Sequence, residues 1–222
     1  MKHETLQRVT AMQADIIMMM ANLIEGRDGT TGEHVKRASI YVNMLLNRLV
    51  EKGIYKEELD SVTTEYIRNA APLHDIGKIT ITDIILQKPA SFTQEEYDIM
   101  KHHSAEGGRL IRENMGRLAD RCFVEIAANM ASYHHEKWNG SGYPDGLKGL
   151  QIPLEARIMA VADVFDALVS KRQYKEKMSL EQAFEILMEE RGIGLEPVLV
   201  DTFLELKDEL KDMLPDKIEL QH

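Results

Sequence analysis

Apolar residues in this chain recur at the three- and four-residue spacing of an α-helix, and the alternating pattern typical of β-strands is nearly absent. The clearest case starts at Leu154, where apolar side chains at offsets of 4, 7, 11 and 14 residues trace one helical face. A short stretch, 79–85, favours an extended conformation. The pattern predicts an all-α bundle of about seven to nine helices, with two informative loops at 77–92 and 136–153.

Capping residues mark where three of these helices begin. In a capping box, a Ser or Thr accepts a hydrogen bond from the backbone N–H three residues later, and a Glu or Gln there reaches back to the first residue. Three such pairs are present: Thr30 with Glu33, Thr93 with Glu96, and Ser179 with Gln182. Gly77 follows an apolar run and is predicted to end a helical turn.

The first 24 residues are predicted to form an amphipathic helix that precedes the main domain. Six residues of this segment follow a three- and four-residue spacing: Leu6, Val9, Gln13, Ile16, Met20 and Leu23. We favour a helix that packs on the core over a coiled-coil seam, because coiled coils need about three or four sustained heptads. A linker or dimerisation helix over 1–24 is the alternative. Residues 25–222 are then expected to form one domain, long enough to bury a core.

The charge balance excludes several classes of partner. The 222 residues include 27 Lys and Arg against 37 Asp and Glu, which gives a formal net charge of −10. Because Lys and Arg supply the attraction to phosphate polymers and anionic membranes, we expect no binding of DNA or RNA polymers and no membrane association. The most apolar run, 16–24, has nine residues, well short of the ~20 that span a bilayer. We therefore expect a cytoplasmic protein without a signal peptide.

The single cysteine, Cys122, limits the chemistry available to the chain. One thiol cannot form an intramolecular disulfide or a cysteine zinc cage, and such low cysteine usage is typical of a reducing compartment. We expect Cys122 to be a small buried apolar side chain. A metal site in this chain would therefore use nitrogen and oxygen ligands.

The placement of the histidines is the strongest indication of function. Two of the eight lie near the termini, and six lie inside helical segments: His34, His74, His102, His103, His134 and His135. Imidazole together with carboxylate favours Fe, Mn, Zn, Ni or Co. A single histidine such as His34 is more often a hydrogen-bonded residue or a surface residue than a ligand. Neighbours on a helix diverge by about 100°, so an adjacent pair can face one metal only near a helix end, and otherwise one member is solvated.

Four strings carry a resemblance to a known family. They are RDGTTGEHVKR at 27–37, LHDIGK at 73–78, HHEKWNGSGYPDGLKG at 134–149 and VADVFDAL at 161–168. Their order resembles the HD superfamily of metal-dependent phosphohydrolases, and the added His103, the His134-His135 pair and Gly142-Tyr143-Pro144 are similar to its HD-GYP subfamily. The family is all-helical, which agrees with the periodicity.

The resemblance implies two adjoining divalent metal ions, with Fe or Mn expected. One ion would be held by His34, His74, Asp75 and Asp163, and the other by Asp75, His103, His134 and His135, so that Asp75 bridges them. Some family members bind a third metal through a Glu four residues before the first ligand histidine. Thr30 stands at that position here, so a third ion is not expected.

The resemblance also implies an activity, the hydrolysis of cyclic di-GMP to pGpG, with onward cleavage to GMP left open. His74, Asp75 and Lys78 would be catalytic, and an attacking hydroxide would bridge the metals. The expected substrate contacts are Lys78, Tyr143, Arg172 and Lys175. Asp166, one turn after Asp163, is expected to form supporting hydrogen bonds rather than bind metal.

Two alternative functions stay open at the level of sequence. The domain could be a signalling or docking module with a slow or vestigial metal site, in which the loop around Tyr143 recognises a protein partner. It could also hydrolyse another nucleotide, such as 3′,3′-cyclic GMP-AMP. A homodimer through the N-terminal helix is a further expectation.

Overall fold

The computed structural model describes residues 2–28, 33–116, 119–170 and 178–213, and the regular elements of these ranges are helices. Their α-helices are α1 (Lys2–Glu25), α2 (Glu33–Lys52), α3 (Ser61–Ala70), α4 (Asp83–Leu86), α5 (Gln94–Met115), α6 (Arg121–Tyr133), α7 (Leu154–Val169), α8 (Leu180–Glu190), α9 (Pro197–Leu204) and α10 (Lys207–Met213). Four 3-10 helices join them: η1 (Gly26–Asp28), η2 (Ala71–Leu73), η3 (Ile76–Thr80) and η4 (Gly149–Gln151). The all-α prediction is confirmed, and the short α4 and α10 bring the helices of the described ranges to ten.

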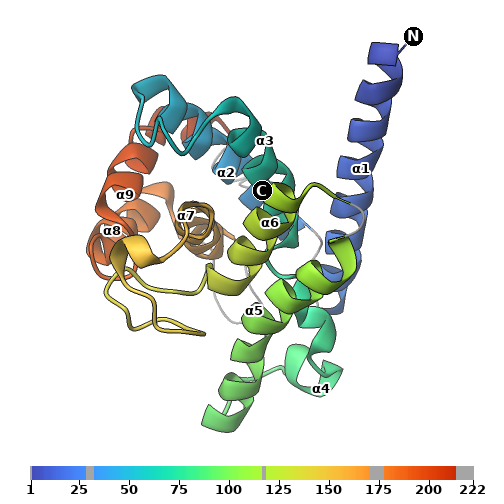
Figure 1. Cartoon of the computed structure of the whole chain (residues 1–222). Coiled ribbons are helices and arrows are strands. Elements are labelled where there is room, and N and C mark those ends of the chain that lie inside the picture. Colours follow the sequence, from blue (N-terminus) through green and yellow to red (C-terminus); the bar gives the residue numbers. More distant parts are fainter. Residues whose placement is uncertain (1, 29–32, 117–118, 171–177, 214–222) are drawn as a thin grey trace, which may run out of the picture.

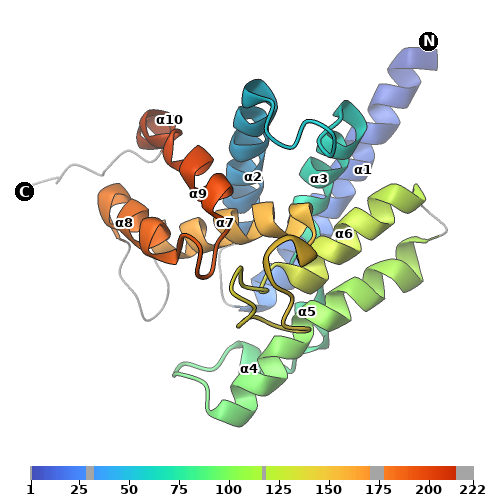
Figure 2. The same ribbon diagram turned by 60° about the vertical axis from the view of Figure 1, so that its left-hand side comes forward.

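Helix α7 lies at the centre of the molecule. It packs against α2, α6, α8 and α9 (Figures 1 and 2). Its predicted apolar face is buried, and the ring of Phe165 contacts Tyr41 of α2 and Phe203 of α9, each with 4.9 Å between ring centroids. One aromatic side chain thus joins three helices, which holds α2 at a set position beside α7.

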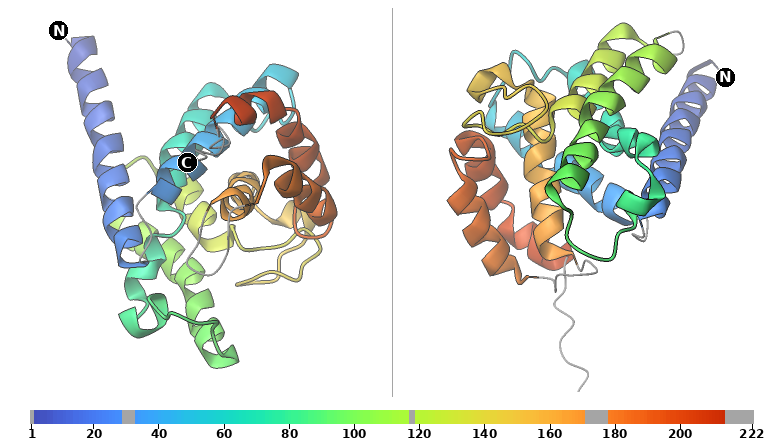
Figure 3. Two further views of the ribbon diagram at one scale, coloured as in Figure 1. Left: turned by 180° about the vertical axis from the view of Figure 1, so that it is seen from behind. Right: turned by 90° about the horizontal axis from the view of Figure 1, so that it is seen from below.

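Helices α5 and α6 form a closely packed pair on the other side of α7 from α8 and α9 (Figures 2 and 3). Gly77 of η3 lies against α5, where an added Cβ would overlap the carbonyl oxygen of His103 and lie 2.5 Å from the amide nitrogen of Gly107. Gly77 lies inside η3, which continues to Thr80, so the prediction that Gly77 ends a helical turn is wrong. Glycine is required there because the backbones of η3 and α5 are in contact.

The stretch 79–85 is also not extended as predicted. The 3-10 helix η3 continues to Thr80, only Ile81 and Thr82 have extended backbone angles, and α4 starts at Asp83. Ile81, Ile85 and the neighbouring Leu86 form a small separate core. Their alternating apolar pattern reflects this local packing and not a strand.

The capping residues behave as predicted where the structure describes them. Thr93 and Ser179 each form a complete capping box, with Glu96 and Gln182 respectively. The third pair starts at Thr30, which lies outside the described residues. Cys122 is exposed in the first turn of α6, so its predicted burial is wrong. Its backbone N–H donates to Asp120, and this helix start faces solvent.

Helix α1 projects from the body of the molecule, and its C-terminal end packs against α2, η2 and η3 (Figures 1 and 3). Ala21, Ile24 and Glu25 are buried there. The division of the chain at residue 25 remains a prediction. No helix in the described part of the chain combines the length and apolar character needed to cross a membrane.

Candidate metal centre

The seven predicted ligand residues come from five separate segments and meet at one place. They lie at the start of α2 (His34), between η2 and η3 (His74 and Asp75), on α5 (His103), directly after α6 (His134 and His135) and in the middle of α7 (Asp163). They form two groups in which one donor atom per residue lies within 4.8 Å of the others: His34, His74 and Asp163 in the first, and Asp75, His103, His134 and His135 in the second. We call these the first and second clusters.

The first cluster joins α2, the turn after η2, and α7. Nε2 of His34 lies 3.3 Å from Nε2 of His74 and 3.6 Å from Oδ1 of Asp163. His74 is fully buried. Two nitrogens and one oxygen therefore converge on one point from three elements that are far apart in the sequence.

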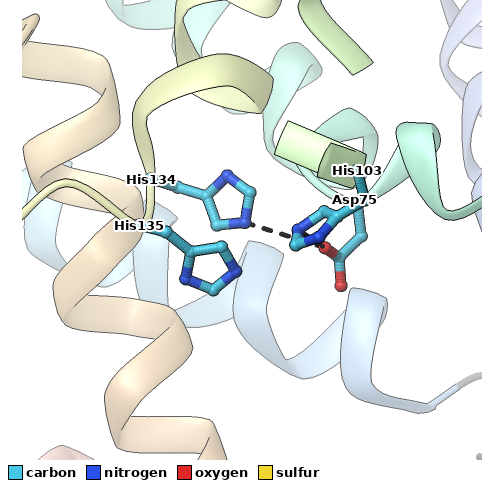
Figure 4. Close-up of side chains that lie close together, drawn as sticks. All are labelled: Asp75, His103, His134 and His135. Carbon is cyan, nitrogen blue, oxygen red and sulfur yellow. Dashed lines mark ion pairs between the residues drawn. The ribbon is translucent and has the colours of Figure 1, made fainter. Parts of the chain in front are cut away.

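The second cluster surrounds the carboxylate of Asp75, as Figure 4 shows. Oδ1 of Asp75 lies 3.3 Å from Nε2 of His103 and 3.7 Å from Nε2 of His134. The His135 ring packs beside His134, with 4.0 Å between centroids. His134 ends α6 as its C-cap residue, so the adjacent pair can turn both rings to one side, as predicted for a helix end.

Asp75 faces both clusters. While Oδ1 points to the second cluster, Oδ2 lies 3.5 Å from Nε2 of His74 in the first. Nζ of Lys78 lies 2.8 Å from the same Oδ2. One carboxylate with an oxygen toward each group is the arrangement that a bridging ligand between two metals needs.

Hydrogen bonds from Nδ1 to backbone carbonyls orient the rings of His74 and His103 for metal binding. Nδ1–H of His74 donates to the carbonyl of Ala71 at 3.0 Å, and that of His103 donates to the carbonyl of Met100 at 2.7 Å. A donating Nδ1 leaves the lone pair on Nε2, directed at the centre. Nε2 of His103 and of His134 are buried without a hydrogen-bond partner among the described residues. A divalent ion would satisfy these atoms, so the donor set fits such an ion.

The charge states of His74, His135 and Asp75 also suit a divalent cation. Burial lowers the pKa of His74 to about 4. Burial, together with His134 and His103, lowers the pKa of His135 well below its usual value. Burial opposes ionisation of Asp75, but Lys78 and the histidines outweigh it and hold the pKa of that carboxyl well below its usual range. Neutral imidazoles and ionised carboxylates are the forms that bind metal.

Asp166 supports the first cluster without belonging to it. Its carboxylate is 1% exposed, lies 2.7 Å from Nδ1 of His34 and accepts hydrogen bonds from Arg37. Burial lowers the pKa of His34, but the hydrogen bond with Asp166 and the charge of Asp163 outweigh it and raise that pKa. The contact from Arg37 to Asp166 was not anticipated. The sequence feature that could have indicated this contact is a matching spacing: Arg37 follows His34 by three residues, and Asp166 follows Asp163 by three residues.

The loop after α6 brings Tyr143 to the second cluster. The ring of Tyr143 lies 4.8 Å from that of His135, at 34° between planes. Gly142 permits this, because an added Cβ would lie 2.5 Å from Cα of Glu136. Glu136 is buried and accepts a hydrogen bond from the backbone N–H of Asp145 at 2.7 Å. This bond connects the start of the loop to the residues that follow Tyr143. Burial raises the pKa of Tyr143, so its hydroxyl stays protonated.

The structure describes some of the remaining predicted residues and not others. Lys78 lies at the centre through its contact with Asp75. His103 is buried and His102 is exposed, which agrees with the prediction that one histidine of this pair would be solvated. Arg172 and Lys175, the other expected substrate contacts, lie outside the described residues, so their roles stay predictions.

Comparison with known proteins agrees with this geometry. The HD domain family matches residues 16–197, a range that contains both clusters. The chain belongs to the HD domain family. Its Gly142-Tyr143-Pro144 motif identifies it as an HD-GYP member of that family. HD-domain phosphohydrolases are metal-dependent, which agrees with the two clusters.

Two relatives from Vibrio cholerae serotype O1 illustrate the similarity. One, named a probable cyclic di-GMP phosphodiesterase, is 44% identical over 195 residues, which are 87% of this chain and 44% of the relative. Another, named 3′3′-cGAMP-specific phosphodiesterase 2, is 40% identical over 205 residues, 91% of this chain and 37% of the relative. The chain thus spans less than half the length of either relative.

A solved structure has the same fold. The crystal structure of a cyclic GMP-AMP-specific phosphodiesterase of V. cholerae, V-cGAP3, superimposes with a TM-score of 0.59 at 20% sequence identity. The match covers 90% of this chain and 51% of that chain. At this identity the likeness concerns the arrangement of the helices.

Proposed function

We propose that this chain is a metal-dependent phosphodiesterase domain that hydrolyses cyclic di-GMP. The observation that carries the proposal is the pair of adjoining clusters with Asp75 between them. A relative of 44% identity is named a probable cyclic di-GMP phosphodiesterase, which supports the choice of substrate.

The residues of this chain have distinct tasks in such a reaction. Two divalent ions, when bound, would lower the pKa of a shared water and stabilise the charge that develops on the phosphoryl oxygens. Asp75 would hold the two sites at a set separation. Lys78, beside Asp75, is placed to donate to a nonbridging phosphate oxygen, and the protonated hydroxyl of Tyr143 is a second donor at the edge of the second cluster.

Two ions per chain, iron or manganese, complete the proposal. Every donor in the two clusters is an imidazole nitrogen or a carboxylate oxygen, the set that these metals share with zinc and other borderline ions. The third ion of some family members would need a carboxylate in place of Thr30.

Cyclic GMP-AMP is the competing substrate, because a relative of 40% identity is named a cGAMP-specific phosphodiesterase. Metal ions held by the two clusters would contact the phosphodiester, which is common to all cyclic dinucleotides, so the clusters do not distinguish the bases. The experiment must therefore compare substrates directly.

Turnover by the metal-loaded chain tests the proposal. The chain is purified without oxygen, loaded with Fe(II) or Mn(II), and given cyclic di-GMP, 3′3′-cGAMP and pGpG in separate assays. We expect cleavage of cyclic di-GMP to pGpG, its loss in His74→Ala and Asp75→Ala, and its retention in His102→Ala, which changes an exposed histidine outside both clusters.

Three results would contradict the proposal in different ways. Faster turnover of 3′3′-cGAMP would reassign the substrate. No turnover of any cyclic dinucleotide by a chain that holds its metal would favour a docking module. Full activity of both His74→Ala and Asp75→Ala would show that the chemistry takes place elsewhere.

A further inference from the structure

A partly exposed tyrosine of α5 lies beside the loop that carries Tyr143. Tyr97 is 44% exposed, and its ring meets that of Tyr143 edge-on, with 6.5 Å between centroids and 85° between planes. Tyr143 in turn packs on His135 of the second cluster at 4.8 Å. An aromatic series therefore runs from the metal centre outward to the surface of α5.

We propose that Tyr97 stacks a purine base of the cyclic dinucleotide and forms, with Tyr143, a base-binding corner beside the second cluster. The inference rests on the proposed function, because it takes the phosphodiester to lie at the metal centre. A base linked to that phosphate through its sugar must lie further out than the phosphate itself. Tyr143 and then Tyr97 lie outward from His135, with ring centroids 4.8 Å and 6.5 Å apart at the two successive steps.

A lysine lies over the ring of Tyr97. Nζ of Lys101, one turn further along α5, lies 5.2 Å from the ring centroid. Lys101 is itself held by Asp98, with Nζ 2.6 Å from Oδ1. A cation over an aromatic face stabilises the ring's position. A side chain restrained by such a contact loses less entropy when a ligand binds, so more of the stacking energy is available for affinity.

Single exposed aromatic residues are common on protein surfaces and need no function. Tyr97 differs because it contacts a residue that packs against the second cluster. Tyr143 borders the second cluster, and His103 of that cluster lies on the same helix as Tyr97, six residues later. The fold thus places an aromatic surface and a metal ligand on one rigid element.

Stacking on an aromatic face contributes affinity without selecting a particular base, because every base has a π-face. Tyr97 is therefore expected to act equally on cyclic di-GMP and 3′3′-cGAMP. It is also expected to act on substrate binding and not on the chemical step, because its ring stands outside both clusters.

The test compares Tyr97→Ala with Tyr97→Phe in the metal-loaded chain. Tyr97→Ala is expected to raise KM for cyclic di-GMP about tenfold while kcat and metal content change little. Tyr97→Phe keeps the aromatic face and should restore a low KM. Phe92→Ala removes an exposed aromatic side chain five residues earlier and serves as the control for loss of surface area.

The outcomes separate this inference from the proposed function. If the wild type cleaves cyclic di-GMP and Tyr97→Ala has an unchanged KM, the stacking role is wrong while the function stands. A fall in kcat or metal content in Tyr97→Ala would show a structural role and would also overturn it. If the wild type cleaves no cyclic dinucleotide, equilibrium dialysis with cyclic di-GMP decides: binding weakened by Tyr97→Ala keeps the inference, and no binding overturns both.

Discussion

Nδ1 of His34 lies 2.7 Å from Oδ2 of Asp166, and the same carboxylate accepts two hydrogen bonds from Arg37. A carboxylate at this nitrogen fixes the tautomer of the ring and directs Nε2 to the first cluster. The contact also joins the first turn of α2 to the last turn of α7, so the position of one proposed ligand depends on the packing of two helices.

Replacement of Asp166 by asparagine should therefore weaken metal binding. The neutral amide of asparagine lacks the negative charge that orients the His34 ring. We therefore expect the metal affinity of the first cluster to fall by about 10–100-fold. Competition with a chelator of known affinity measures this. Asp201→Asn is the matched control, because Asp201 pairs with Arg191 at 2.7 Å in an exposed ion pair away from both clusters. Equal affinities in the two variants would exclude an orienting role for Asp166.

The two clusters should lose their ions separately. His103→Ala removes a nitrogen of the second cluster and leaves the first intact, so the metal content should fall from two ions per chain to one. His102→Ala changes the adjacent exposed histidine and should keep both ions. Elemental analysis of the purified variants gives the count. A wild type with three ions would contradict the two-metal proposal.

Gly77→Ala should destabilise the fold around the site, because the added methyl group has no space. Its Cβ would overlap the carbonyl oxygen of His103, and both backbones would have to shift. We expect a loss of about 3 kcal/mol in the free energy of unfolding, measured by urea denaturation. Gly26→Ala is the control, because a Cβ there meets no atom within 4 Å. Equal stability of the two variants would mean that η3 can move away from α5 at little cost.

The partly buried carboxyl of Glu155 should make stability depend on pH. Burial raises its pKa above 4.5, although a hydrogen bond from Asn129 at 2.9 Å partly opposes this. The folded state therefore favours the protonated form, and this contribution to stability is lost as the pH rises from 4.5 through the folded pKa. Glu155→Gln should be more stable than the wild type at pH 7, with a difference that shrinks toward pH 4.5.

Urea denaturation in EDTA at both pH values measures this difference without a contribution from metal binding. A difference between Glu155→Gln and the wild type that stays constant with pH would show that ionisation of Glu155 is not its source.

The residues of the candidate metal centre could be named from the sequence, because the motifs that contain them are short and local. The pairs at 74–75 and 134–135 identify candidate donors by residue type. The helical period predicted that one of His102 and His103 points inward, the family resemblance chose His103, and His103 is the buried one. The same reasoning failed for Gly77 and Cys122. Whether a glycine ends a turn or touches another backbone depends on what packs against it, and so does the burial of a cysteine.

The sequence by itself determined the all-helical class, the chemical nature of the donors and the absence of thiolate ligands, because these follow from residue type and periodicity. Only the tertiary structure decided that the two oxygens of Asp75 face different clusters, that Arg37 neutralises Asp166, and that Tyr97 reaches Tyr143. These relationships join segments from different parts of the chain. They exist only because α2, α5, α6 and α7 pack in one arrangement around the turn between η2 and η3.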